Sequence, residues 1–129
     1  MNYVYTAIFH QDSGKIIARI PDLPGCISSG RELTEAIQEI TDAASGYLVV
    51  AEDEELTIPA PTPQNQLTVP KGDELSYIRV DTLAYRRSKD THAVRKNVSL
   101  PAWMAKLAEK RGINCSEVLQ EGLLKRFYA

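Results

Sequence analysis

Residues 94–129 contain a strand–helix–helix pattern that is too short to enclose a hydrophobic core by itself. The segment 94–100 predicts a strand, and Pro101 starts a helix over 101–111, where proline costs no hydrogen bond. Gly112 ends that helix, and the run NCSE at 114–117 predicts the capped start of a second helix over about 115–127. So short a unit usually needs a partner, and so does a lone strand. The pattern therefore predicts a homodimer whose two strands pair as an antiparallel ribbon on four helices.

The alternation of side chains along a strand assigns the two faces of this ribbon. Val98 and Leu100 are apolar and should point into the core of the dimer. The outward side chains can hydrogen-bond to base edges, and they are Arg95, Asn97 and Ser99. A two-stranded ribbon fits the major groove of DNA, so the pattern favours a DNA-binding repressor. The alternative is a polar strand face in plain solvent.

The second helix of this segment adds a possible phosphate site. Its N-terminus, near Asn114, Cys115 and Ser116, should present unpaired backbone N–H groups, which bind phosphate well. Gly122 would normally weaken a helix interior, so we expect a close crossing of two helices there. The apolar sides of the two helices are formed by Trp103, Met104, Leu107 and Ala108, and by Val118, Leu119, Leu123 and Phe127.

The first part of the chain has the periodicity of a mixed sheet and helix domain. Residues 2–10, 15–20, 26–30 and 75–83 predict four strands, the first two joined as a hairpin by a turn ending in Gly14. Residues 32–51 predict an amphipathic helix, because apolar residues recur with helical spacing from Leu33 to Ala51. The proline-rich stretch 56–72 predicts an extended surface loop. The expected fold class is α+β, with a βββαβ domain followed by the βαα module.

The charge divides along the chain in the same way. Residues 1–82 hold five Lys and Arg against 13 Asp and Glu, a net charge of −8. Residues 83–129 hold ten against four, a net charge of +6. The basic part suits nucleic acid, and the acidic part could attract a basic protein. We expect a first domain over 1–83, a linker or short helix over 84–93, and the DNA-binding module over 94–129.

Catalytic and metal-binding interpretations find little support. Three aspartates lie in expected turns, loops or strand ends, namely Asp12, Asp22 and Asp81. The acidic run 52–55 should be a solvated helix end. Neither histidine has a metal-ligand partner at suitable spacing. No nucleotide-binding or hydrolase motif occurs. We therefore expect no enzyme activity and no cofactor. Free cysteines, the lack of a secretory signal and the lack of a membrane-spanning apolar run favour a cytoplasmic protein that does not enter the membrane.

Two stretches resemble known families. RKNVSLP, followed by a helix, GINCSE and a second helix, resembles ribbon-helix-helix repressors. IPDLPGCISSGRELTEAI, after a hairpin, is similar to HicB-type antitoxins, which combine a partial RNase-H-like N-terminal domain with a C-terminal DNA-binding module. Lys96 departs from the ribbon pattern, because an apolar residue is usual at that inward position; its stem could extend to carry the charge to a phosphate.

The resemblance implies a type II antitoxin that binds a HicA-type toxin, an mRNA interferase, blocks its catalytic histidine and represses its own operon. Candidate toxin contacts are the loop residues Asp22, Leu23 and Pro24 and the acidic helix face formed by Glu32, Glu35 and Glu39. Ordinary loop structure and helix solvation explain each of these residues equally well. The alternatives are a stand-alone repressor, whose N-terminal domain binds a ligand or oligomerises, and a metal-dependent nuclease.

Overall fold

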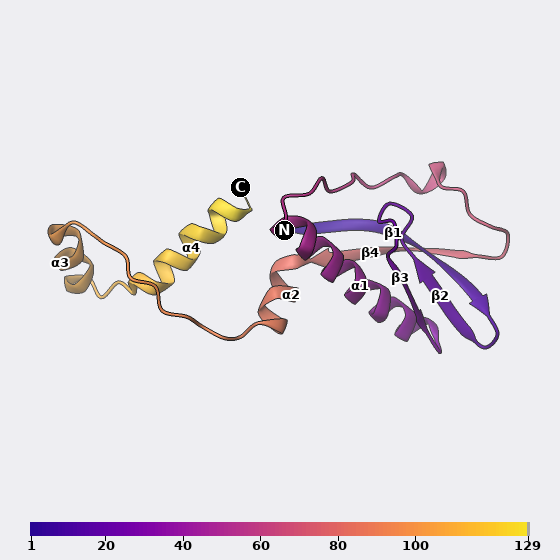
Figure 1. Ribbon diagram of the computed structural model, residues 1–129, viewed down its shortest axis with the longest axis horizontal. Helices are drawn as coiled ribbons and strands as arrows, with labels where there is room; N and C mark the ends of the chain where they lie inside the picture. The colour runs from indigo at the N-terminus through magenta and orange to yellow at the C-terminus, as the bar shows by residue number, and fades with distance from the viewer. Residues whose placement is uncertain (129) are drawn as a thin grey trace. The chain divides into compact units, whose positions relative to one another are not determined.

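The computed structural model describes residues 1–128, which divide into two compact units between Thr91 and His92. The first unit contains four strands and two α-helices, and the second contains two α-helices. Their succession along the chain can be followed in Figure 1. The expected linker over 84–93 is mostly helical: α2 spans Thr82–Lys89 and is part of the first unit.

The first unit is built on a four-stranded antiparallel sheet in the order β3-β2-β1-β4. The strands are β1 (Asn2–Asp12), β2 (Lys15–Arg19), β3 (Ile27–Gly30) and β4 (Glu74–Asp81). The β1–β2 hairpin turns through Ser13 and Gly14, both with positive φ, as a two-residue hairpin loop requires. Together with helix α1 (Leu33–Asp53) the strands confirm the predicted βββαβ order.

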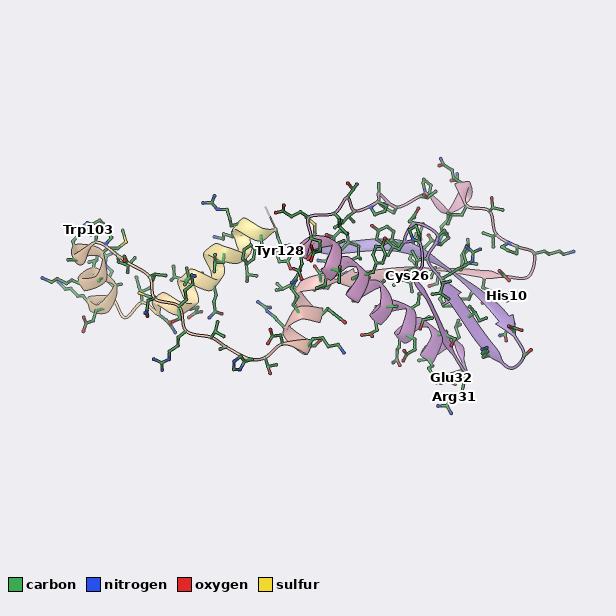
Figure 2. The ribbon with its side chains drawn as sticks, in the orientation of Figure 1. His10, Cys26, Arg31, Glu32, Trp103 and Tyr128 are labelled. Atoms are coloured by element: carbon green, nitrogen blue, oxygen red, sulfur yellow. The ribbon has the colours of Figure 1, made fainter. Side chains whose placement is uncertain are left out.

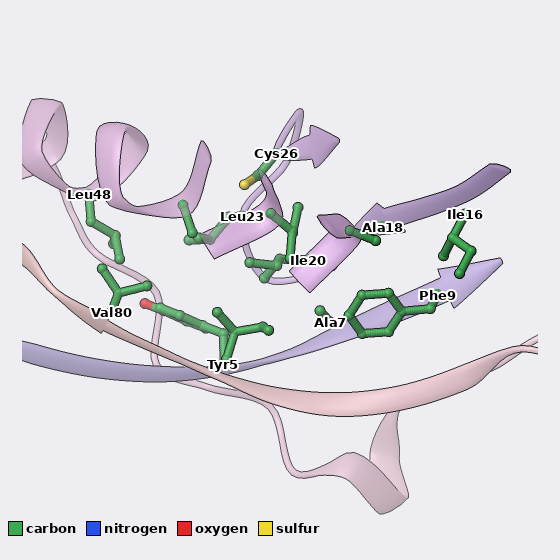
Figure 3. Packing of buried hydrophobic residues seen from close by; sticks show 14 residues of the cluster. Tyr5, Ala7, Phe9, Ile16, Ala18, Ile20, Leu23, Cys26, Leu48 and Val80 are labelled. Carbon is green, nitrogen blue, oxygen red and sulfur yellow. The ribbon is translucent and has the colours of Figure 1, made fainter. Parts of the chain in front are cut away.

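Helix α1 packs on one face of this sheet. Tyr5, Ala7 and Phe9 alternate along β1 on the face that joins the buried cluster with α1. Figure 3 shows their side chains among those of Ile20, Leu23 and Leu48. The buried positions of α1 include three alanines and one serine, whose small side chains let the helix approach the sheet closely: Ala36, Ile40, Ala44, Ser45, Leu48 and Ala51.

Two residues of the expected apolar face of α1 are exposed instead of buried. Leu33 and Tyr47 are 43% and 38% exposed. The buried stripe is narrower than the spacing of apolar residues indicated, because the single sheet face covers one side of the helix and leaves its flanks open. Both residues therefore belong to the surface of the first unit.

Gly30 is where β3 meets the start of α1. A Cβ atom built on Gly30 would lie 2.4 Å from the backbone nitrogen of Ala36 and 2.8 Å from its Cα. These are main-chain atoms that cannot rotate away. Glycine is therefore required for the helix to begin directly over the end of the strand.

Within the first unit, hydrogen bonds of two residue pairs join the proline-rich segment 56–72 to β1 and to the loop after β2. The Tyr5 hydroxyl donates to the carbonyl oxygen of Pro59. The Thr62 backbone N–H donates to the Asp22 carboxylate at 2.9 Å, and the Thr62 hydroxyl donates to the other carboxylate oxygen. The segment contains only one short helical turn, Gln64–Gln66, so the prediction of an extended loop agrees with the structure.

The second unit contains α3 (Ala102–Lys110) and α4 (Cys115–Phe127), within one or two residues of the predicted bounds. Gly112 has φ +64°, and the Ile113 N–H donates to the Ala108 carbonyl at 2.9 Å. These are the marks of a helix closed by a C′ glycine, as predicted. Residues 90–101 form neither helix nor strand in the single chain. The strand over 94–100 therefore stays a prediction that depends on a second chain.

Candidate DNA-binding and toxin-binding surfaces

The second unit leaves its apolar side chains in solvent. Among residues 92–128, none is buried. Ten large apolar side chains of this unit are exposed, namely Val94, Val98, Leu100, Trp103, Met104, Ile113, Val118, Leu119, Leu123 and Phe127. Soluble monomers rarely expose so dense an apolar set. A single copy of this unit is therefore incomplete as a folded module.

The predicted ribbon residues lie within this incomplete unit. The expected inward residues Val98 and Leu100 are 55% and 45% exposed. Arg95, Lys96, Asn97 and Ser99 are also exposed, so the single chain does not separate an inner from an outer face. A strand acquires two faces only when it pairs and packs, which this segment does not do within one chain.

Helix α4 begins as predicted. The Asn114 side chain accepts a hydrogen bond from the Glu117 backbone N–H at 3.2 Å, so Asn114 is the N-cap. The first-turn N–H groups of a helix have no intrahelical acceptors, and Cys115 and Ser116 are exposed at this end. Asn114 itself uses its side chain for capping, so an anion here would be held by backbone groups.

The expected close helix crossing at Gly122 is not formed within one chain. No atom lies within 4 Å of a Cβ built on Gly122. A role for this glycine in a crossing between helices of two chains remains a prediction.

The loop candidates for toxin contact have different environments. Leu23 is fully buried in the core of the first unit, so it has no surface to offer a partner, and its expected place at an interface needs correction. Asp22 is partly buried, and its carboxylate accepts hydrogen bonds from Thr62. Pro24 is exposed. The sequence could not separate these roles, because all three residues lie in one short loop.

The acidic candidates lie along the first half of α1. Glu32 and Glu39 are exposed, and Glu35 is half-buried with an oxygen 3.5 Å from Arg31 Nε. Figure 2 shows Arg31 and Glu32 where α1 begins. Acidic groups are favourable at this end because of the helix dipole. The three carboxylates thus give α1 an acidic outer surface, with Glu39 and Glu32 the most accessible.

Glu52 is mostly shielded from solvent and accepts several hydrogen bonds, where the sequence indicated a solvated acidic run. Its side chain is only 14% exposed. The hydroxyls of Tyr3 and Thr82 donate to Oε2 at 2.8 and 2.9 Å, and Arg86 donates to Oε1 at 3.1 Å. Arg86 also contacts Asp53 at 2.9 Å. These bonds join β1, α1 and α2, and no local spacing in the sequence predicts them.

Two buried groups resist ionisation. Desolvation raises the pKa of the Tyr5 hydroxyl, and the nearby Asp22 carboxylate and Tyr47 raise it further. Burial raises the pKa of the Cys26 thiol, whereas Cys115 lies exposed at the start of α4. Tyr5 and Cys26 are therefore core groups that remain protonated and unreactive in the folded chain.

Two of the three aspartates considered for a metal site have structural roles. Asp22 binds Thr62, and Asp81 caps α2 by accepting from the Ala84 N–H at 3.1 Å. His10 Nδ1 lies 2.8 Å from the Asp73 carboxylate. Within residues 1–128 no group of three His, Cys, Asp or Glu side chains is arranged to hold a metal ion. Over the same residues, no helix is long and apolar enough to cross a membrane.

Several solved structures share the fold. A toxin–antitoxin complex from Streptococcus pneumoniae contains a chain that matches with a TM-score of 0.62 and 19% identity, over 98% of this chain and 99% of the other. The antitoxin HicB of Burkholderia pseudomallei matches with a TM-score of 0.55 and 20% identity, over 95% of both chains. A chain of the HicA3 and HicB3 toxin–antitoxin complex matches with a TM-score of 0.51 and 18% identity, over 61% of this chain and 99% of its own.

The sequence itself places the chain in a family. No curated protein sequence matches it significantly. The family model described as the HicB-like antitoxin of bacterial toxin–antitoxin systems, however, matches residues 5–121, which include most of both units. The chain therefore belongs to the HicB-like antitoxin family.

Proposed function

We propose that this antitoxin neutralises a HicA-type toxin through its first unit and represses its own operon through its second. As a dimer, the second unit would place a two-stranded ribbon in the major groove of operator DNA. Arg95, Asn97 and Ser99 would read base edges, while Lys96 and the N-terminus of α4 would hold phosphates. The protein would act by binding rather than by catalysis.

The observation that carries the DNA-binding half is the unburied apolar set of the second unit. Two chains that paired residues 94–100 would supply each strand with its hydrogen-bonding partner and would bury Val98 and Leu100 against α3 and α4. The order of proline, helix, glycine and capped helix after the predicted strand supports this arrangement. Burial of apolar area contributes about 25 cal/mol per Å², which would drive the association.

The toxin-binding half is supported by charge and by family. The outer surface of α1 is acidic, and a toxin that cleaves mRNA must bind a polyanion and so is expected to be basic. A chain of the solved HicA3 and HicB3 toxin–antitoxin complex has a fold similar to 61% of this chain. Glu32 and Glu39 are exposed and can form ion pairs with a partner without first breaking internal contacts.

The first experiment is co-expression with the small reading frame beside this gene. If that product arrests growth alone, and this chain rescues growth and co-purifies with it, the antitoxin assignment holds for this pair. Absence of both toxicity and a complex would contradict it and would favour a stand-alone repressor.

A charge-reversed variant locates the toxin contact. Glu32→Lys/Glu39→Lys should weaken the complex and the rescue, because basic residues would oppose a basic toxin. Glu54→Lys/Glu74→Lys changes the charge equally at other exposed positions and should behave as wild type. Equal loss in both variants would mean that overall charge, and not the α1 surface, controls binding.

A further inference from the structure

Helix α2 carries three cations in its last turn, namely Arg86, Arg87 and Lys89. They are not equivalent. Arg86 is bound by Glu52 at 3.1 Å and Asp53 at 2.9 Å, so its charge is neutralised within the first unit. Cations at a helix C-terminus also interact favourably with the helix dipole. This interaction alone explains why one cation lies at the end of α2.

Arg87 and Lys89 are exposed. Lys89 is 60% exposed and lies 4.0 Å from Asp42, a distance at the limit of an ion pair between two solvated groups. Such a pair contributes little. Both cations border a hollow of about 390 Å³ lined by Val49, Tyr85, Arg86, Arg87, Lys89 and Asp90. Two accessible cations thus stand at the end of α2.

The position of these cations along the chain is specific. Four residues separate Lys89 from Val94, where the predicted ribbon begins. An extended chain spans at most about 3.6 Å per residue, so the Lys89 Cα lies within about 18 Å of the Val94 Cα in any arrangement of the two units. A strand that enters a major groove about 12 Å wide must pass beside the phosphates that border it.

The net negative charge of the first unit gives a second reason for cations at the end of α2. Residues 1–91 hold eight Lys and Arg against 14 Asp and Glu, a net charge of −6. DNA would repel such a unit, and the repulsion would be greatest at the end tethered to the ribbon. Cations at that end would replace repulsion by attraction.

We propose that Arg87 and Lys89 bind backbone phosphates of the DNA that flank the ribbon. This inference rests on the proposed DNA-binding function. It adds a sequence-independent contact from the first unit to the base-reading contacts of the second. The DNA backbone is the partner because its charge is complementary and because the chain connection keeps these two residues near it.

The test is the salt dependence of operator binding by the full-length protein. Each lost phosphate contact lowers the magnitude of the slope of log Kobs against log salt by about 0.9. Arg87→Ala/Lys89→Ala removes two cations per chain, or four per dimer, so the magnitude should fall by about 3 to 4. The matched control, Arg31→Ala/Lys71→Ala, removes the same charge from exposed positions of the first unit and should keep the wild-type slope.

Three further measurements separate phosphate binding from structural effects. The affinities for operator and for scrambled DNA should fall by the same factor, because phosphate contacts carry no sequence information. Arg87→Lys/Lys89→Arg keeps both charges and should restore the slope. Arg87→Glu/Lys89→Glu should weaken binding further, while circular dichroism checks that α2 remains folded.

These measurements separate failure of the phosphate contact from failure of the proposed DNA-binding function. Wild-type protein that shows no preference for operator over scrambled DNA would contradict the proposed function. Wild-type protein that binds the operator, with equal slopes in Arg87→Ala/Lys89→Ala and in the control, would overturn the phosphate contact alone.

Discussion

At the scale of single residues, Gly30 shows how one missing side chain permits a junction. The β3–α1 contact leaves no space for a methyl group against the backbone of Ala36. The sequence marks Gly30 only as the end of a short strand. Its close approach to α1 follows from where the helix lies on the sheet.

Gly30→Ala should destabilise the first unit by about 1–3 kcal/mol, the cost of forcing a group into a filled space. Urea unfolding followed by circular dichroism measures this change. Gly46→Ala is the control, because its Cβ would meet only Tyr85 Oη at an ordinary 3.5 Å and alanine favours the helix. A Gly30→Ala variant as stable as Gly46→Ala would show that the junction has room.

The raised pKa of Tyr5 predicts that the free energy of unfolding falls as the pH rises in the alkaline range. Its pKa is raised in the folded chain from 10.0, so the folded state holds the phenol proton more tightly than the unfolded state. The stabilisation is complete below pH 10 and is lost as the pH rises through the folded-state value.

Tyr5→Phe should therefore show a smaller fall in the free energy of unfolding above pH 10 than wild type. At neutral pH it should lose about 1 kcal/mol, because the hydrogen bond to Pro59 is absent. Tyr77→Phe, at a position 65% exposed, should follow wild type at every pH. Identical alkaline slopes in all three proteins would contradict this account.

Asn97 is the residue whose assignment tests base reading. Asn97→Ala should cost about 1–3 kcal/mol of specific operator binding and relax selectivity at one base pair. Gel shifts with the operator and its single-base variants measure both effects. Asn65→Ala, at an exposed position outside the second unit, should leave affinity and selectivity unchanged. Undiminished selectivity in Asn97→Ala would count against the ribbon.

At the scale of elements, α1 ends in an unusual way. The Leu56 N–H donates to the Ala51 carbonyl at 2.9 Å, and the Glu55 N–H donates to Glu52, a pattern that needs a left-handed residue at Glu55. Glu55 adopts φ +53° although it has a side chain. Left-handed backbone costs a non-glycine residue about 1–2 kcal/mol.

Glu55→Gly should raise the free energy of unfolding by about 0.5–1 kcal/mol, since glycine relieves this strain but costs more entropy on folding. Glu54→Gly is the matched control, because Glu54 has φ −90° and gains nothing from glycine. Chemical denaturation of both variants gives the comparison. A destabilised Glu55→Gly would mean that the carboxylate has a role that outweighs the backbone strain.

The elements also show why some predictions were accurate. Strand and helix bounds follow from periodicity and from caps, which are local, so Gly14, Gly112 and Asn114 mark their turns and caps correctly. Two expectations for α1 were wrong in part. Leu33 and Tyr47 fit the helical spacing but are exposed, and Glu52 is held by three donors although it belongs to an acidic run. Each depends on the neighbour that covers the helix.

At the scale of the whole molecule, the two units differ in completeness. The first unit encloses a core between its sheet and α1. The second exposes the apolar side chains that a partner copy would cover. Self-association should therefore depend on the second unit.

Leu123→Asp should prevent the expected dimer from forming and abolish operator binding, because a charge would be placed in the expected dimer core. Light scattering after gel filtration measures the mass, and a gel shift measures binding. Lys125→Asp places an aspartate two positions further along α4, on the opposite side of the helix, and should remain dimeric. A Leu123→Asp variant that stays dimeric and binds normally would refute the assignment of the buried face.

The sequence alone determined the βββαβ order of the first unit and the two helices of the second. It also determined the division into an acidic and a basic part, the helix caps and the resemblance that the family match confirms. These properties are local or additive, so spacing, composition and turn chemistry carry them. Only the tertiary structure decided that Leu23 is a core residue, that Gly30 must lack a side chain, and that Glu52 joins β1, α1 and α2. Those facts arise because residues distant in the chain come together, and the energy of burying or pairing a group depends on those neighbours.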